Sequence, residues 1–387
     1  MTNPFTPGNG VEPKFLAGRE EYLQEFSKSL EASENGLPQN MVVYGLRGTG
    51  KTVLARHYRL IAEAEGWAVI ERELNGRLSD EGAFGDCFGK DIAAKASEIS
   101  VKARVAETGK ALIRTLKPES LTAYGITYKP YYEEPKRILS DYLEEILMGN
   151  WPVFQKAGKK GVVLVYDEMH SLRDAKEDKQ YTLSSLLESI AHVQRKGARY
   201  YLCACGLPNL KTNLKGAKTY TERMFHFQQV GNLQEGEARK ALVEPARREG
   251  FAFEDALVSQ IIGETDGYPY FLQFYGYYLL EDSGKNRISS ADFKAMRPGL
   301  LERLDKSFFE DRFELASASE RKILLAMAKS GSGDVPLSDV KKATEIDDNS
   351  FQQMFGRLAE KGLVYRVGRG RYSFTIPLFK DYLKRIN

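Results

Sequence analysis

The sequence predicts an α/β protein: a parallel sheet with helices on both faces, followed by an α-helical domain and a smaller C-terminal domain. Three observations predict it. In residues 1–230, short apolar runs typical of strands alternate with helical patterns. Residues 231–300 show helical patterns without strands between them, and residues 301–387 end in three helical patterns and a hairpin. A chain of 387 residues is also too long for one core, so two or three domains are expected.

The elements of the first domain, residues 1–230, follow from its apolar pattern. Strands are expected at 41–44, 67–75, 161–168 and 198–206, and helices at about 22–30, 51–65 and 181–194. An insertion at about 78–150 is largely helical and polar, with a Pro- and Tyr-rich break, YGITYKPYYEEP, in its middle. A solvated helical face is the default interpretation of this insertion, and an arm that docks a partner is the alternative.

The composition excludes several classes of protein. Hydrophobic residues make up 42% and charged residues 28%, as in ordinary globular proteins. The net charge is only +3, but residues 316–387 carry 13 Lys and Arg against 8 Asp and Glu. Cys87, Cys203 and Cys205 cannot form a disulfide framework, and no apolar run approaches the length of about 20 residues that spans a bilayer. The N-terminus does not resemble a signal peptide, so we expect a cytoplasmic protein without membrane contact.

Residues 45–52, GLRGTGKT, match the pattern G-x-x-x-x-G-K-[ST] completely. Glycines let the backbone turn a row of N–H donors toward a phosphate chain, and the following helix directs its positive end to the same phosphates. Lys51 is expected to reach the β- and γ-phosphates, and the Thr52 hydroxyl to ligate Mg²⁺. The alternative is a Gly-rich turn with a solvated lysine. The expected nucleoside-triphosphate site comprises Gly45, Leu46, Arg47, Gly48, Thr49, Gly50, Lys51, Thr52 and Val53.

Two acidic residues, Asp167 and Glu168, end the buried strand GVVLVYDE. Asp167 is expected to hold the water shell of Mg²⁺, and Glu168 to orient and deprotonate the attacking water. The alternative is that they cap the next helix. The pair suits hydrolysis better than phosphoryl transfer to a small molecule. With Lys51 as a further catalytic group, the sequence predicts an ATPase that uses ATP and Mg²⁺ and releases ADP and phosphate.

The end of the chain has the winged-helix order of elements, three helices and then a two-stranded hairpin, after a linker helix within residues 301–387. In DNSFQQMFGRLAEKG the apolar residues share one helical face, and Gln352, Gln353 and Arg357 lie on the other, where they can read base edges. Arg369 and Arg371 form a basic hairpin tip suited to phosphate. Double-stranded DNA is therefore one expected partner. The alternative is a protein contact, since Asp347 and Asp348 disfavour close approach of phosphate.

Taken together, the glycine loop, the strand ending in Asp167 and Glu168, the helical lid domain at 231–300 and the winged helix resemble AAA+ P-loop ATPases. The archaeal-type branch is the most similar, and it adjoins the origin-recognition proteins and the STAND signalling ATPases. FLAGREEYL resembles the F-x-G-R-E box of that branch, which would place Phe15 and Arg19 near the adenine; a helix N-terminus is the alternative. Gly267-Tyr268-Pro269 resembles the G-x-P motif of STAND proteins, which implies that Pro269 helps to bind the nucleotide; a Gly-Pro helix boundary is the alternative.

The resemblance also implies an assembly. AAA+ proteins carry an arginine finger near the end of the core domain, and Arg223 matches that position. The finger would neutralise charge on a γ-phosphate across a subunit boundary of a homo-oligomer; a surface arginine paired with Glu222 is the alternative. Two departures from the AAA+ pattern bear on the hydrolysis rate: LCACGLPN lacks the polar first sensor, and the lid lacks the second-sensor arginine. The expected function is an Mg-ATP-driven switch of conformation or assembly that acts on DNA, with a STAND-like switch acting on a protein partner as the alternative.

Overall fold

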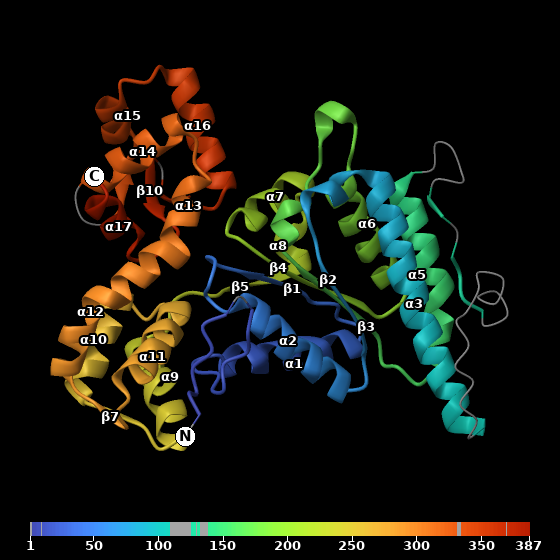
Figure 1. Cartoon of the computed structure of the whole chain (residues 1–387). Coiled ribbons are helices and arrows are strands. Elements are labelled where there is room, and N and C mark those ends of the chain that lie inside the picture. Colours follow the sequence, from blue (N-terminus) through green and yellow to red (C-terminus); the bar gives the residue numbers. More distant parts are fainter. Residues whose placement is uncertain are drawn as a thin grey trace. The chain divides into compact units, whose positions relative to one another are not determined.

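The structure is a computed structural model, which describes residues 2–8, 10–108, 125–128, 130–131, 138–330, 334–368 and 370–387. The chain divides into two compact units (Figure 1). The sheet unit comprises Arg19–Gly45 and Lys51–Val230. The helical unit comprises Met1–Gly18, Leu46–Gly50 and Gly231–Asn387. The middle of the glycine loop therefore belongs to the helical unit, whereas its two ends belong to the sheet unit.

A five-stranded parallel sheet forms the centre of the sheet unit, with the order β2-β3-β4-β1-β5. Its strands are β1 (Asn40–Tyr44), β2 (Ala68–Glu73), β3 (Val162–Asp167), β4 (Tyr200–Gly206) and β5 (Phe225–Gln229). The four strands expected from the sequence are confirmed. The fifth was missed, because in FHFQQ at the edge of the sheet buried and exposed residues are mixed and no continuous apolar run marks the strand.

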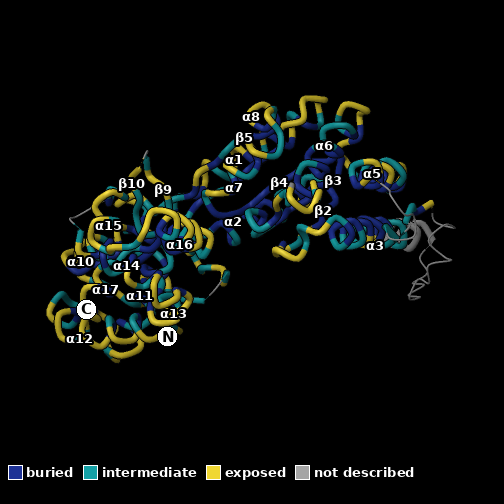
Figure 2. Tube along the Cα trace, turned by 90° about the horizontal axis from the view of Figure 1, so that it is seen from above, coloured by how far each residue is buried: buried dark blue, intermediate teal, exposed yellow. Residues whose placement is uncertain are grey.

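Helices cover both faces of this sheet, as expected. The helices of the sheet unit are α1 (Glu20–Glu34), α2 (Lys51–Ala64), α3 (Glu81–Thr108), α5 (Leu139–Lys156), α6 (Thr182–Arg195), α7 (Asn209–Ala217) and α8 (Thr221–Met224), with short 3₁₀ turns at Gly76–Ser79, Met169–Ser171 and Lys176–Asp178. One core joins α1 and α2 to one face, and a second core joins α3, α5, α6 and α7 to the other. Strands β3 and β4 are buried along nearly their whole length, whereas the outer sides of the helices are exposed (Figure 2).

The insertion is helical wherever the structure describes long stretches of it. Helix α3 has 28 residues, and α5 packs against both α3 and α6. Of the Pro- and Tyr-rich break, only 125–128 and 130–131 are described, and the helical pattern expected at 109–124 lies outside the described residues. In the described parts of the chain, no helix combines the length and the apolar character that crossing a bilayer requires.

The helical unit begins with four helices, α9 (Glu235–Arg248), α10 (Asp255–Thr265), α11 (Pro269–Ser283) and α12 (Ser290–Leu304). The expectation of helices without strands is wrong in one detail, because Ala252–Phe253 (β6) and Arg287–Ile288 (β7) form a short parallel pair. The N-terminal segment also packs here. Phe5 is buried against these helices, and the Asn3 side-chain amide donates to the Tyr277 carbonyl at 2.9 Å.

A continuous stretch of helix then leads to the C-terminal elements. Helix α12 passes through a π-helical turn, Asp305–Phe309, into α13 (Glu310–Glu314). The elements that follow are α14 (Ala318–Lys329), β8 (Val335–Pro336), α15 (Leu337–Thr344), α16 (Asp348–Glu360), β9 (Val364–Gly368), β10 (Arg371–Phe374) and α17 (Phe379–Arg385). The three helices and the hairpin were expected; β8, which pairs with β10, and α17 were not.

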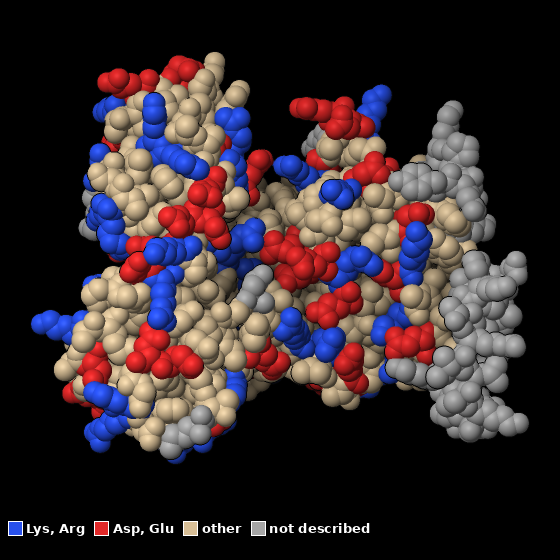
Figure 3. Space-filling model, in the orientation of Figure 1, with Lys and Arg blue, Asp and Glu red and all other residues tan. Residues whose placement is uncertain are grey.

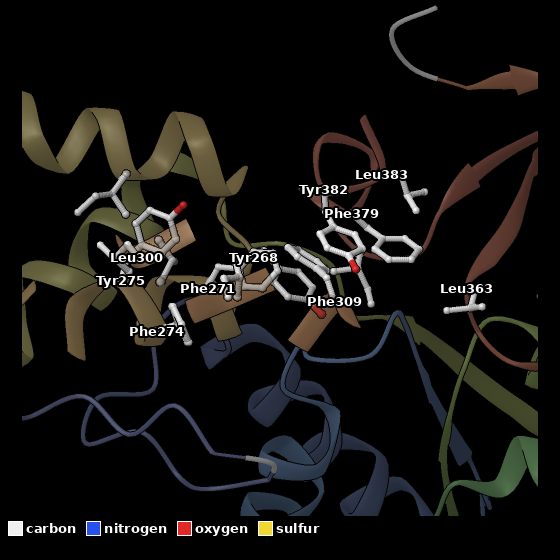
Figure 4. Packing of buried hydrophobic residues seen from close by; sticks show 14 of the residues in the cluster. Tyr268, Phe271, Phe274, Tyr275, Leu300, Phe309, Leu363, Phe379, Tyr382 and Leu383 are labelled. Carbon is white, nitrogen blue, oxygen red and sulfur yellow. The ribbon is translucent and has the colours of Figure 1, made fainter. Parts of the chain in front are cut away.

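Aromatic packing fixes the π-helical turn within the helical unit. Figure 4 shows Phe309 between the aromatic side chains of α11 and those of α17. Its ring lies 5.9 Å from that of Phe271 and 5.4 Å from that of Tyr382, centroid to centroid. One hydrophobic core therefore runs from the four lid helices through this turn into the C-terminal elements.

Candidate nucleotide-binding site

The glycine loop leaves the carboxyl end of β1 and leads directly into α2. Strand β1 lies between β4 and β5, so the loop emerges inside the carboxyl edge of the sheet, where ligands of parallel α/β folds bind. Gly48 and Gly50 have φ angles of 75° and 91°, which only glycine adopts without strain. The Thr49 hydroxyl donates to the Leu46 carbonyl at 2.9 Å and closes the turn. Gly50, a fixed glycine of the motif, and Gly48, at one of its variable positions, are thus both required by backbone conformation.

The first residues of α2 bring a cation and a hydroxyl to the same edge. Lys51 is the first residue of the helix and is only 6% exposed. The Thr52 hydroxyl donates to Asp167 Oδ2 at 2.7 Å, although the two residues are 115 positions apart in the chain. Val53 is buried and anchors the helix. The fold therefore joins the end of the loop to the end of β3, as the motif predicted.

This hydroxyl–carboxylate pair suits magnesium. Among the described residues, no group of three or more His, Cys, Asp or Glu side chains could hold a metal by itself. Mg²⁺ does not need such a cage, because in nucleotide sites it takes one or two protein oxygens and completes its shell with phosphates and water. Thr52 and Asp167 supply that pair of oxygens next to the phosphate loop.

Glu168 follows Asp167 in a strained position. Its φ angle is 52°, in the left-handed region that non-glycine residues rarely occupy and that is common at functional sites. It stands at the N-cap of the 3₁₀ turn Met169–Ser171, yet its carboxylate makes no capping hydrogen bond. Instead, Glu168 Oε2 lies 3.6 Å from His170 Nε2. The helix-capping interpretation of Glu168 is therefore not supported.

In the helical unit, Tyr268 contacts the glycine loop directly. Its hydroxyl donates to the carbonyl of Arg47, and a Cβ atom at Gly48 would overlap that hydroxyl. The Tyr268 side chain is fully buried, and burial raises its pKa. Sequence reasoning selected the neighbouring Pro269 and missed this tyrosine. The only available signal was its place between a glycine and a proline.

Pro269 and Gly267 set the position of Tyr268. Pro269 opens α11 at its first turn, as expected for a Gly-Pro helix boundary. Gly267 has a φ angle of 65°, and a Cβ there would collide with the Leu233 carbonyl. Gly267-Tyr268-Pro269 thus both forms a helix boundary and supplies the side chain that contacts the glycine loop.

The F-x-G-R-E box is divided between the two units. Phe15, in the helical unit, lies under the guanidinium of Arg248, with 5.2 Å from Cζ to the ring centroid. Arg19, in the sheet unit, stands at the N-cap of α1, 5% exposed, with its guanidinium over the Tyr22 ring. Burial lowers the pKa of Arg19. A role of Phe15 and Arg19 at the adenine stays a prediction.

Comparison with known families and structures identifies the part of the chain that carries this site. The model of the AAA ATPase domain matches residues 16–195. Residues 16–195 are thus similar to AAA ATPase domains. Residues 306–383 match a second family, described as a domain of unknown function (DUF8462). The comparison with curated proteins gave no match.

Three solved structures illustrate what this chain is similar to. The Walker-type ATPase PABY2304 of Pyrococcus abyssi has a TM-score of 0.62 and 16% identity, covering 95% of this chain and 96% of its own. This likeness establishes the fold along nearly the whole chain. The ORC1 protein of Aeropyrum pernix, solved with DNA, has 14% identity and a TM-score of 0.46, covering 96% and 94%. Cdc6p of Pyrobaculum aerophilum has 17% identity and a TM-score of 0.45, covering 98% and 97%.

Arg223 follows the matched residues 16–195 in the chain; it lies in α8, immediately before β5, and is exposed. Strands β1 and β5 are parallel, with Asn40 opposite Phe225 and Tyr44 opposite Gln229, so Arg223 lies at the amino edge of the sheet. About 16 Å of strand separates it from the edge at which the loop begins. Its guanidinium makes no ion pair with a described carboxylate, and Glu222 pairs with Lys215 instead. This location is incompatible with action on the loop of the same chain.

The matched residues end before the expected first-sensor position, which is the end of β4. Cys205 is buried there, and its hydrogen bond with Cys203 and its burial raise the pKa of its thiol. A thiol held in this way orients water poorly. Asn209 lies nearby as the first residue of α7 and is exposed.

Of the side chains expected to contact DNA, Gln352 and Gln353 are exposed on α16, as required. Arg357 is not free: its Nε lies 3.1 Å from Oε1 of Glu320, which is 1% exposed. Lys361 Nζ lies 2.5 Å from the other oxygen of the same carboxylate. Arg357 therefore neutralises a buried charge, a pairing that sequence spacing does not reveal.

The hairpin contributes one described basic residue of the two expected. Arg371 is exposed and donates to the Asp334 carbonyl at 2.9 Å, whereas Arg369 lies outside the described residues. On the face drawn in Figure 3, acidic and basic side chains are interspersed over the C-terminal helices. No single basic patch is visible on that face.

Proposed function

We propose that the chain is an ATPase that binds Mg-ATP in Gly45–Thr52 and couples hydrolysis to a change of conformation or assembly. The observation that carries this proposal is the Thr52–Asp167 hydrogen bond at 2.7 Å, directly after a complete phosphate-binding sequence. The match of residues 16–195 to the AAA ATPase domain supports it. It also agrees with the branch of AAA+ proteins that the sequence resembles.

Each residue of the site has a role in this proposal. Backbone N–H groups of the loop and the Lys51 ammonium would hold the phosphates, and Thr52 and Asp167 would hold Mg²⁺, which when bound would supply charge neutralisation of the phosphates. The Glu168 carboxylate accepts a proton from the attacking water, which then adds to the γ-phosphorus as the bond to the ADP oxygen breaks. Because Cys205 replaces a polar first sensor, we expect slow turnover.

Replacing Thr52 by alanine should raise the Mg²⁺ concentration needed for half-maximal hydrolysis by about 10-fold or more, because one of two protein oxygens near the ion is lost. Magnesium titrations of phosphate release check this. Ser27→Ala is a matched control, since Ser27 also donates to a carboxylate, that of Glu65, at 2.7 Å. An equal increase of the half-maximal Mg²⁺ concentration in both variants would show that Thr52 is not a magnesium ligand.

Arg223 is proposed to act on the nucleotide of a neighbouring copy in a homo-oligomer, since it lies at the edge of the sheet opposite the loop. Its guanidinium would stabilise charge on the γ-phosphate, so Arg223→Ala should lower turnover by about 10-fold or more. Mixing Arg223→Ala with Glu168→Gln protein should restore activity, because each variant supplies what the other lacks. Arg195→Ala, at another exposed arginine, is the control. No restoration in a demonstrated oligomer would contradict the proposal.

Double-stranded DNA is the proposed target of the C-terminal winged helix, through Gln352, Gln353 and Arg371. The exposed glutamines on α16 and the basic hairpin support this. Arg371→Ala should reduce the slope of log affinity against log salt by about 0.9, the value of one lost phosphate contact. Fluorescence anisotropy with a labelled duplex measures it, with Lys384→Ala on α17 as control. An unchanged slope would contradict the role of Arg371.

A protein partner is the second candidate for this domain. It is favoured by the Arg357–Glu320 ion pair, which occupies a side chain that base contacts would need. It is also favoured by the acidic N-cap, because Asp347 accepts from Ser350 N at 3.0 Å and Asp348 follows it. A purified protein that retains ADP, turns over slowly and shows no salt-dependent affinity for duplex DNA would support this candidate.

A further inference from the structure

A cavity of about 580 Å³ lies in the sheet unit, where the N-termini of α3, α5 and α6 come together. Helix α5 packs against both α3 and α6 (Figure 1). The segment before α6 and the end of α7 complete the walls, and none of the residues assigned above to the nucleotide site lines them. The volume is in the range of cavities that hold a small molecule.

The three helix N-termini at this cavity differ in their caps. Asp80 Oδ1 accepts from the N–H of Ala83 in α3 at 2.8 Å, and Asp174 Oδ1 accepts from the N–H of Ser184 in α6 at 3.0 Å. Helix α5 has Ile138 at its N-cap, and no described side chain caps it. The first turn of α5 therefore offers N–H donors and a partial positive charge to the cavity.

Ser185, in α6, is a deeply placed donor at the same cavity. It lines the cavity although it is only 7% exposed. Among the residues that the structure describes, no group forms a hydrogen bond with its hydroxyl. By contrast, Ser189, one turn further along the helix, is 1% exposed and donates to the Leu186 carbonyl at 3.0 Å. Because buried hydroxyls as a rule have partners, the Ser185 hydroxyl points to an acceptor that enters the cavity.

Three carboxylates also line the cavity, and each already has a donor. Glu81 Oε1 accepts from the Tyr181 N–H at 2.7 Å, Asp174 caps α6, and Glu188 Oε2 lies 2.7 Å from Lys218 Nζ. Their repulsion of a ligand grows with the negative charge that the ligand carries. They therefore disfavour a doubly charged ligand, such as a phosphate monoester, more than a singly charged one.

A lysine and two apolar side chains complete the chemistry of the cavity. Lys179 lines it and is exposed, and no carboxylate in the described parts of the chain forms an ion pair with this lysine. Ile138 and Tyr181, the N-cap residues of α5 and α6, also line it and are 63% and 43% exposed. Small polar residues are usual at N-caps, so two exposed apolar side chains there suit contact with an apolar ligand.

We propose that this cavity binds a small organic carboxylate. The carboxylate group accepts hydrogen bonds from the Ser185 hydroxyl, the Lys179 ammonium and the N-terminus of α5. The apolar body of the ligand packs against Ile138 and Tyr181. This inference goes beyond the proposed function and does not depend on it, because the cavity shares no residue with the nucleotide site.

The first test is a ligand-observed NMR titration of the whole chain with acetate, hexanoate and phenylacetate as probes. Phenylacetate and hexanoate should bind saturably and more tightly than acetate, which lacks an apolar body. The neutral phenylacetamide and the doubly charged phenyl phosphate should each bind about 10-fold more weakly than phenylacetate. Absence of saturable binding by all three carboxylates, or equal or tighter binding of phenylacetamide or phenyl phosphate, would overturn the inference.

The second test uses variants of the two side-chain donors. Ser185→Ala should weaken phenylacetate binding about 3-fold and Lys179→Gln about 10-fold, as a neutral and a charge-assisted hydrogen bond are lost. Ser185→Ala should not lower the melting temperature, because no described group pairs with that hydroxyl. Ser189→Ala and Lys196→Ala are the controls: Ser189 bonds within α6, Lys196 pairs with Glu144 at the other end of that helix, and neither change should alter the affinity.

The outcomes separate a ligand site from a structural feature. Unchanged phenylacetate affinity in both Ser185→Ala and Lys179→Gln, or an equal loss in the two controls, would overturn the inference. If Ser185→Ala does not fold, as judged by circular dichroism, the exposed Lys179→Gln decides alone. Lys51→Ala, which tests the nucleotide site, should leave phenylacetate binding intact; loss of that binding in Lys51→Ala would place the probe in the glycine loop and contradict this inference.

Discussion

Replacing Glu168 by glutamine is expected to leave ATP binding intact and to lower turnover by about 10²- to 10⁴-fold, the usual contribution of a general base. Glutamine keeps the size and one oxygen of the side chain but cannot accept the proton. Glu168 is the residue directly after Asp167, which holds the Thr52 hydroxyl at 2.7 Å. Its left-handed backbone, with a φ of 52°, fixes the direction of the side chain. Single-turnover phosphate release and nucleotide titration measure the two effects separately.

A carboxylate on the neighbouring strand provides the control for this experiment. Glu73 ends β2, is exposed and lies opposite Asp167 in the strand register. Glu73→Gln therefore removes the same charge from the same edge of the sheet without touching the proposed base, and its turnover should match the wild type. Unchanged turnover in Glu168→Gln, or a comparable loss in Glu73→Gln, would mean that the base lies elsewhere.

Removing the Lys51 side chain should weaken ATP binding by about 10- to 100-fold and lower kcat/KM by at least as much. The loss corresponds to one or two charge-assisted hydrogen bonds to phosphate, each contributing about 1.5–3 kcal/mol. Lys51 is suited to this role because it is 6% exposed at the start of α2, where the helix dipole also favours an anion. Titration of Lys51→Ala with Mg-ATP measures the change.

Lys211 is the matched control for the charge itself. It lies in α7 with its ammonium 5.7 Å from the ring of Tyr44, the last residue of β1, so it is near the same end of that strand. Lys211→Ala removes one positive charge there without altering the loop. If both alanine variants lose ATP affinity equally, a general positive field rather than a specific lysine accounts for binding.

Much of the sheet unit could be predicted because its signals are local. Strands β1, β3 and β4 are buried on both faces and therefore appear as continuous apolar runs, and the glycine pattern has strict spacing. The contact between Thr52 and Asp167 followed from the rule that carboxyl ends of parallel strands share one edge. Strand β5 could not be predicted in this way, because FHFQQ at an edge mixes buried and exposed residues and contains no continuous apolar run.

Contacts between distant segments account for what the sequence did not reveal. The Tyr268 hydroxyl donates to the Arg47 carbonyl, although the two residues are 221 positions apart in the chain. Glu320 forms ion pairs with Arg357 and Lys361, which precede the hairpin. Neither pairing leaves a periodic pattern. The sequence placed Gln352 and Gln353 correctly on an exposed helical face, because the helical period alone determines which face a residue occupies. Local periodicity thus predicts elements and faces, while partners of charged side chains require the fold.

The central claim, that the loop Gly45–Thr52 holds the phosphates of ATP, is tested most directly by calorimetric titration of the full-length chain with Mg-ATP. The account predicts a saturable heat with one nucleotide bound per chain, and a loss of affinity of about 10- to 100-fold in Lys51→Ala. The absence of any binding heat over several temperatures, or equal affinity in wild type and Lys51→Ala, would contradict it.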